Sequence, residues 1–201
     1  PFDAASLTED YELGLAIAAA GGRGMIARVW GKDARRPVAV EAYFPATLDA
    51  AVRQKARWMT GIALAGWDRV GWGRALDLTE HWMRIRDRRA SIAVLVLGAA
   101  YVAVVAWGLA VLLRWGIGAP WVALPIPDWL LATNAVLLGW RLAMRAAFTG
   151  AAYGWREACW SLPRAFVGNL IALLAARRAI IRYIAMLRGA RPVWDKTAHV
   201  F

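Results

Sequence analysis

The residues best suited to do chemistry in this chain lie on one stretch, residues 47–61. Gln54, Arg57 and Trp58 stand at positions i, i+3 and i+4, so a helix would place an amide, a fixed cation and an indole on one face. A guanidinium can hold a phosphate, and an indole can stack on a sugar ring. The alternative is an amphipathic helix with Trp58 in the core and Arg57 on the surface.

A helix over 47–61 is expected from the residues at its two ends. Thr47 is a good N-cap, and Asp49 suits the positive end of the helix dipole. Gly61 can end or loosen the helix. These signals predict that the amide, the guanidinium and the indole are held on one rigid element.

A second polar group, Thr8-Glu9-Asp10, opens another predicted helix. Ser6 and Glu9 fit a capping box, which gives Glu9 a purely structural explanation. Two glycines at 21–22 stop this helix. Beyond them, β-prone runs at 25–30 and 38–43 flank a polar turn and predict a hairpin.

A Thr-Glu-Asp triplet followed along the chain by Gln-x-x-Arg-Trp resembles the inverting family 2 glycosyltransferases. The likeness is closest to the membrane-bound, cellulose-synthase-like group. Residues 7–15 and 52–58 are similar to its phage adsorption protein B-like branch. The resemblance covers residues 1–61 and implies the C-terminal part of a GT-A-like α/β transferase domain.

The resemblance also implies roles for the residues of both motifs. Asp10 would be the catalytic base, within the catalytic group Thr8, Glu9 and Asp10. Gln54 and Arg57 would lie near the donor diphosphate, and Trp58 at the acceptor sugar. The full-length enzyme would use a divalent metal, Mg or Mn. The Asp-x-Asp that binds this metal in the family is missing here, so no metal ligands are expected in this chain.

Composition points to a membrane protein. The chain has 201 residues, 60% of them hydrophobic, and a formal charge of +11; its mean hydropathy is +0.42. Its basic residues cluster beside apolar runs, as at cytoplasmic membrane edges, so a nucleic-acid partner is not expected. Cys159 is the single cysteine, which excludes an internal disulfide. A start at Pro1, without Met or a signal peptide, is interpreted as the C-terminal part of a longer protein.

Two apolar runs, 90–113 and 124–148, are long enough to span a bilayer. A basic collar over 84–89 precedes the first run, and arginines follow the second. The positive-inside rule therefore predicts two transmembrane helices with cytoplasmic outer ends and an outside loop at 115–127. A third apolar stretch is too short to span, so 163–187 is expected to be an interfacial or protein-packed helix that starts near Pro163.

The predicted fold is a mainly α membrane protein fragment in five parts. They are the C-terminal half of a transferase domain (1–61), an interfacial connector (62–89), two transmembrane helices (90–148), an interfacial basic helix region (149–191) and a cytoplasmic tail (192–201). The connector has a soluble alternative in which its indoles are buried. In the tail, Trp194, Lys196, Thr197 and His199 resemble the segment where processive relatives carry a gating loop; a simple surface tail is the alternative.

Two functions follow as hypotheses. The first is part of a multi-pass glycosyltransferase of the bacterial inner membrane. Its catalytic side and its C-terminus would be cytoplasmic, and the fragment alone would have no activity. The enzyme would transfer a sugar from a nucleotide-sugar donor to a surface polysaccharide or similar glycan acceptor, and contact membrane lipids and an outer-membrane or export partner. The second is a non-catalytic membrane module needed for phage adsorption or for assembly of a polysaccharide export complex.

Overall fold

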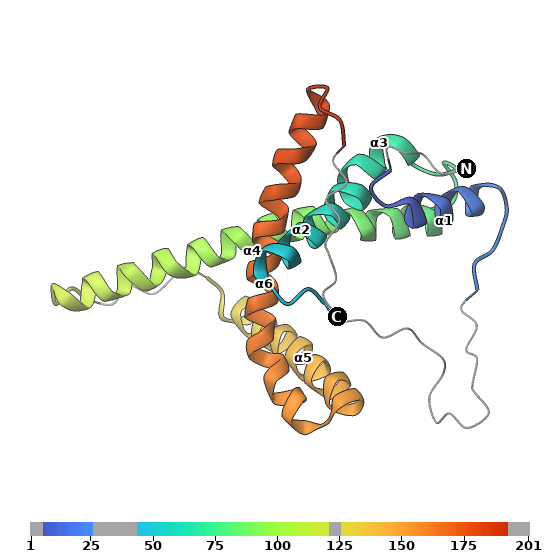
Figure 1. Ribbon diagram of the computed structural model, residues 1–201. Helices are drawn as coiled ribbons and strands as arrows, with labels where there is room; N and C mark the ends of the chain where they lie inside the picture. Colours follow the sequence, from blue (N-terminus) through green and yellow to red (C-terminus); the bar gives the residue numbers. More distant parts are fainter. Residues whose placement is uncertain (1–5, 26–43, 121–125, 193–201) are drawn as a thin grey trace. The chain divides into compact units, whose positions relative to one another are not determined.

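The computed structural model describes residues 6–25, 44–120 and 126–192, and this part of the chain is mostly helical, without a strand (Figure 1). The predicted hairpin lies, except for Met25, outside the described residues. The elements in chain order are α1 (Glu9–Ala19), α2 (Leu48–Trp58), the π-helix η1 (Met59–Ala65), α3 (Gly66–Val70), α4 (Leu78–Gly116), α5 (Asp128–Tyr153) and α6 (Trp155–Leu187).

The chain divides into two compact units. The first consists of Pro1–Leu95 with Ile171–Phe201, and the second of Val96–Leu170. Both α4 and α6 pass from one unit into the other. The first unit contains both motifs and is the one that positions the site.

The core of the first unit joins α2 to the C-terminal part of α6. Val52, Ala56 and Met59, spaced on one helical face, are buried against three alanines of α6 (Ala175, Ala176 and Ala179). Alanine has the smallest side chain that still buries apolar surface, so the two helices can approach closely. Larger side chains at these alanines would overpack the contact. The helix with the Gln-x-x-Arg-Trp motif is therefore held directly by α6.

The second unit is held by polar contacts between its helices. The Asn169 side-chain amide donates to the Tyr101 hydroxyl at 3.1 Å, and Arg145 Nε donates to the Ser161 carbonyl at 2.9 Å. Pro163 lies inside α6, so the prediction that this helix starts near Pro163 is wrong. Proline lacks the N–H that would donate to the carbonyl four residues earlier, here that of Cys159, and a long helix tolerates the loss of one such hydrogen bond.

Among the described residues, α4 is the one helix long and apolar enough to cross a membrane. It contains the predicted first span, 90–113, but begins upstream of the basic collar, so the collar and the apolar run form one continuous helix. The predicted second span, 124–148, begins outside the described residues and continues into α5. That second span stays a prediction.

Candidate functional site

The Thr-Glu-Asp motif opens α1, whose first residue is Glu9. The Thr8 carbonyl accepts hydrogen bonds from the backbone N–H groups of Tyr11 at 3.1 Å and Glu12 at 3.2 Å. The Ser6 hydroxyl accepts from the Thr8 N–H at 3.2 Å. The predicted capping box between Ser6 and Glu9 is therefore wrong. A capping box needs the serine at the N-cap and the glutamate three residues later, whereas here Thr8 is the N-cap and Glu9 follows it directly.

The Thr8 side chain packs against η1. A Cβ built on Gly61 would lie 2.5 Å from Thr8 Cγ2 and 2.6 Å from Thr8 Oγ1. Thr8 Oγ1 is buried and has no hydrogen-bond partner within the described part of the chain. A glycine at position 61 is thus what lets the Thr-Glu-Asp segment lie against the end of the Gln-x-x-Arg-Trp helix, and the two motifs meet at this contact.

The helix with the second motif, α2, begins as predicted and continues into the π-helix η1. The Thr47 hydroxyl accepts from the Ala50 N–H at 3.3 Å, which confirms Thr47 as the N-cap. The helix does not end at Gly61 but loosens from Met59 into η1. The Thr60 hydroxyl, which is fully buried, donates to the Ala56 carbonyl at 2.8 Å. Such π-helical turns occur frequently at functional sites.

The predicted binding residues lie on α2 with different exposures. Gln54 is half-buried, and its Oε1 is buried without a hydrogen-bond partner in the described chain. Arg57 is half-buried, whereas Trp58 has 42% of its surface exposed. Trp58 therefore does not lie in the core of this chain, because Val52 and Ala56 supply the buried face of α2. The exposed indole of Trp58 thus directly follows the half-buried guanidinium of Arg57 along α2.

A small cavity of about 100 Å³ adjoins Arg57. Leu7 and Thr60 line it from the two motif segments, and Arg182 and Arg191 line it from α6 and the turn that follows. From the sequence, Arg182 is expected only as part of an interfacial or protein-packed helix over 163–187, with no role in a site. Its approach to Arg57 could not be found from spacing, because the two residues are joined only by the packing of α2 on α6.

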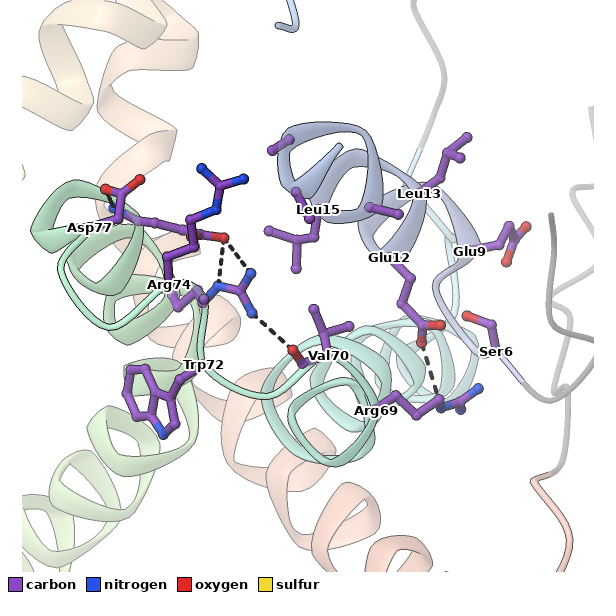
Figure 2. A pocket seen from close by; sticks show the side chains of 16 residues that line it. Ser6, Glu9, Glu12, Leu13, Leu15, Arg69, Val70, Trp72, Arg74 and Asp77 are labelled. Carbon is purple, nitrogen blue, oxygen red and sulfur yellow. Dashed lines mark hydrogen bonds and ion pairs between the residues drawn. The ribbon is translucent and has the colours of Figure 1, made fainter. Parts of the chain in front are cut away.

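A larger cavity of about 870 Å³ lies beside α1 (Figure 2). Glu9 and Glu12 line it from α1, and Arg69, Trp72 and Asp77 line it from α3 and the loop that follows. Figure 2 shows the ion pair that joins Arg69 Nε to Glu12 Oε1 at 3.7 Å. Carboxylates, guanidinium groups and an indole line this one cavity, and all three kinds of group can contact a sugar.

The structure separates the three predicted catalytic residues. Thr8 packs on Gly61, Glu9 lines the larger cavity, and Asp10 is exposed and does not line that cavity. Glu9 and Asp10 diverge because consecutive residues of a helix point about 100° apart around its axis, and Thr8 precedes the helix as its N-cap. Within this chain, Asp10 and Glu9 therefore face different surroundings.

Two arginines of the predicted basic collar have a structural role. Arg84 donates to the carbonyls of Val70 at 3.2 Å and Gly71 at 2.6 Å, and Arg88 donates to the Gly71 carbonyl at 3.2 Å. The Arg88 guanidinium also stacks over the Trp67 ring at 4.4 Å. Both arginines are buried, so they close the C-terminal end of α3, where unpaired carbonyls and the helix dipole favour a cation.

Burial shifts two titratable groups near the motifs. It raises the pKa of the Tyr11 phenol, with a further contribution from the Asp87 carboxylate. It lowers the pKa of Lys55, which stands between Gln54 and Arg57 in the second motif. Both shifts disfavour the charged form of a side chain that lies partly inside the first unit.

One group of predicted residues lies in a part of the chain that the structure does not describe. The candidate gating residues Trp194, Lys196, Thr197 and His199 lie outside the described residues. Over residues 6–25, 44–120 and 126–192, no three His, Cys, Asp or Glu side chains form a group that could hold a metal ion.

Comparison with known proteins identifies the family. Residues 1–176 match the family model described as Glycosyl transferase family group 2. The chain is 31% identical over 223 residues to Bacteriophage adsorption protein B of Escherichia coli (strain K12) and to Bacteriophage N4 adsorption protein B of Escherichia coli O157:H7. The alignment covers 100% of this chain and 29% of each relative, so the chain spans less than a third of their length. No solved structure matches it. Because the family match covers most of its length, this chain belongs to the glycosyl transferase family group 2.

Proposed function

We propose that this chain is the C-terminal, membrane-embedded part of an inverting glycosyltransferase of the bacterial inner membrane. It would transfer a sugar from a nucleotide-sugar donor to a surface polysaccharide or a similar glycan. The contact of Thr8 with Gly61 supports this proposal most, because it brings the Thr-Glu-Asp and Gln-x-x-Arg-Trp motifs together. The donor's nucleoside would be bound by residues outside this chain, which spans 29% of its relatives.

In the proposed reaction, Asp10 acts as the general base. It takes the proton of the acceptor hydroxyl while that oxygen attacks the anomeric carbon of the donor sugar. The bond to the diphosphate breaks, the nucleoside diphosphate leaves, and the anomeric configuration inverts. Asp10 lies in the first turn of α1 and is exposed, so an acceptor hydroxyl can approach its carboxylate.

The α2 motif would serve the two substrates. Arg57, with Gln54, would stabilise the negative charge that grows on the leaving diphosphate. Trp58 would stack on the acceptor sugar, and its 42% exposure leaves the indole available in this chain. The full-length enzyme would bind Mg or Mn, which supplies positive charge at the diphosphate. The described residues offer no group that fits such an ion, so its ligands would lie outside them.

The membrane arrangement belongs to the same proposal. Two spans would place both outer ends, and with them the motifs and the C-terminus, in the cytoplasm beside the nucleotide sugar. The interfacial part of α6 would contact lipids, and the glycan would pass to an outer-membrane or export partner. The fragment alone would be inactive, because it lacks the nucleoside side of the site.

The names of the relatives favour a second candidate, a role in phage adsorption. The chain would then be a non-catalytic membrane module that supports adsorption or assembly of an export complex, with its motifs kept as scaffold. The two candidates differ in one respect: the enzyme needs the proton acceptor at Asp10, whereas the module does not.

The experiment compares the full-length protein and its Asp10→Asn variant in membrane vesicles supplied with a panel of nucleotide sugars. The wild type is expected to incorporate one sugar into a glycan, and the variant is expected to lose about 10²–10⁴-fold in rate. Phage adsorption is measured in the same two strains. Adsorption that survives in the Asp10→Asn strain, without sugar transfer by either protein, would favour the module and contradict the enzyme.

A further inference from the structure

We propose that Arg182 and Arg191 complete, with Arg57, an oxyanion site for the donor diphosphate. This inference rests on the proposed function, and it assigns two residues beyond both motifs to the leaving-group side of the site. The cavity of about 100 Å³ beside Arg57 carries the argument. All three arginines line it, and all three belong to the first unit.

The first step concerns how Arg182 reaches this cavity. Arg182 lies on α6 one turn after the alanines that pack against α2. The close approach of the two helices through Ala56 and Ala179 therefore sets the separation of Arg57 and Arg182. A guanidinium contributed by each helix faces the same hollow.

The second step concerns Arg191, which follows the end of α6. The Ala190 N–H donates to the Ala185 carbonyl at 3.0 Å, and the Gly189 N–H donates to the Met186 carbonyl at 2.9 Å. Gly189 has φ +93°, and this combination is a Schellman motif. The turn reverses the chain just past the helix, and Arg191 then lines the same cavity as Arg182. A residue with a Cβ would be strained at position 189.

The third step concerns charge. The described lining of this cavity contains three guanidinium groups and no carboxylate; its other members are Thr60 and apolar side chains. Three guanidinium groups bring several N–H donors to one small hollow, so a compact anion with several acceptor oxygens is the complementary ligand. Planar guanidinium donors match phosphate oxygens, and the Thr60 hydroxyl adds a further polar group. A diphosphate is a compact anion of this kind, so it suits a cavity of about 100 Å³ lined by three guanidinium groups.

The alternative source of a phosphate is a lipid head group. The cavity adjoins Leu7, which directly precedes the Thr-Glu-Asp motif, and Thr60, which follows Trp58 in η1. Because its walls come from both motif segments, we assign the site to the donor and not to a lipid. The experiment below separates the two sources.

The test measures binding of inorganic pyrophosphate to the purified full-length protein by isothermal titration calorimetry in the presence of Mg²⁺. Arg182→Gln and Arg191→Gln are each expected to weaken pyrophosphate binding about 10-fold or more, because each removes hydrogen bonds to a charged group. Arg182→Lys keeps the charge without the planar fork and should weaken binding less. Arg178→Gln is the matched control. Arg178 lies one turn earlier on α6, pairs with Asp49 at 3.6 Å and does not line this cavity.

Equal pyrophosphate affinity in the wild type and in both glutamine variants would overturn the inference, and so would equal weakening by Arg178→Gln. If a glutamine variant fails to accumulate in the membrane, the Arg182→Lys protein is used for the test instead.

Nanodiscs with zwitterionic or anionic lipid give the second arm of the experiment. Pyrophosphate affinity that falls only with anionic lipid would assign the site to a head group and contradict the proposal. Nucleotide-sugar turnover is assayed separately, so a wild type that binds pyrophosphate but transfers no sugar contradicts the proposed function alone.

Discussion

Thr8 and Gly61 approach each other so closely that a methyl group on Gly61 would lie 2.5 Å from Thr8 Cγ2. Gly61 lies in η1, which continues α2, and Thr8 is the N-cap of α1. The contact therefore fixes where the Thr-Glu-Asp segment sits against the Gln-x-x-Arg-Trp helix. Because catalysis depends on such placement at the ångström scale, this pair is the first to test.

Gly61→Ala in the full-length protein should lower the thermal unfolding midpoint, because the new methyl overlaps Thr8. Overpacking of this kind costs about 1–3 kcal/mol. The double variant Thr8→Ala with Gly61→Ala should recover part of that loss, since alanine lacks both the Cγ2 and the Oγ1 atoms. Gly14→Ala is the matched control: Gly14 is also helical, and a Cβ there would meet nothing within 4 Å. A Gly61→Ala protein as stable as Gly14→Ala would show that the two segments do not pack as described.

Asp10→Asn and Glu9→Gln should separate the two carboxylates by their effect on sugar transfer. The proposed base predicts a loss of about 10²–10⁴-fold for Asp10→Asn and a much smaller effect for Glu9→Gln. Both changes keep the side-chain size, and initial rates at equal membrane levels are the measurement. The reverse order of effects would move the base to Glu9, which lines the larger cavity.

Arg84→Ala should destabilise the first unit by about 1.5–3 kcal/mol, because it leaves the carbonyls of Val70 and Gly71 without this donor and also removes the ion pair with Glu80. Arg84 has 3% of its surface exposed. Arg86→Ala is the control, since Arg86 is exposed and pairs only with its neighbour Asp87 among the described contacts. Thermal unfolding of the two variants in one detergent gives the comparison, and equal midpoints would remove the proposed role of Arg84 at the end of α3.

Topology can be tested by labelling single cysteines in intact cells. Cys159 is exposed, so the background needs Cys159→Ser. Two spans with cytoplasmic ends predict that Ile117→Cys, at an exposed position beside Gly118, reacts with an impermeant maleimide and that Ala198→Cys does not. Labelling at position 198 would mean that α6 crosses the bilayer, and the two-span proposal would be wrong.

Tyr183 should give the first unit a pH-dependent contribution to stability. Its hydroxyl donates to Asp68 Oδ2 at 2.7 Å, and this hydrogen bond, with burial, raises the pKa of Tyr183 to about 12. The unfolded phenol titrates near its ordinary pKa of 10, so the stabilisation is fully present below pH 10 and is lost as the pH rises from 10 to 12. Unfolding midpoints of the wild type and Tyr183→Phe should therefore differ at pH 8 and converge as the pH rises from 10 to 12. A constant difference across this range would mean that Tyr183 does not titrate in this way.

The sequence by itself determined the local elements and the family. Thr47 marked the start of the Gln-x-x-Arg-Trp helix, and the spacing of Gln54, Arg57 and Trp58 placed them on it, because N-capping and helical periodicity act over a few neighbouring residues. The uncharged run 90–113 marked the helix that can cross a membrane. Its actual start at Leu78 and the position of Pro163 inside α6 were missed, because helix ends respond to tertiary contacts as well as to local signals.

Only the tertiary structure decided which distant residues meet. The contact of Thr8 with Gly61, the approach of Arg182 to Arg57 and the burial of Arg84 against α3 each join segments far apart in the sequence. An arginine in a sequence does not reveal whether its guanidinium contacts lipid, solvent or the end of another helix. Helix packing determines which group each arginine contacts, because small residues let α2 and α6 approach each other. Neither the spacing of the motifs nor the net charge predicts these contacts.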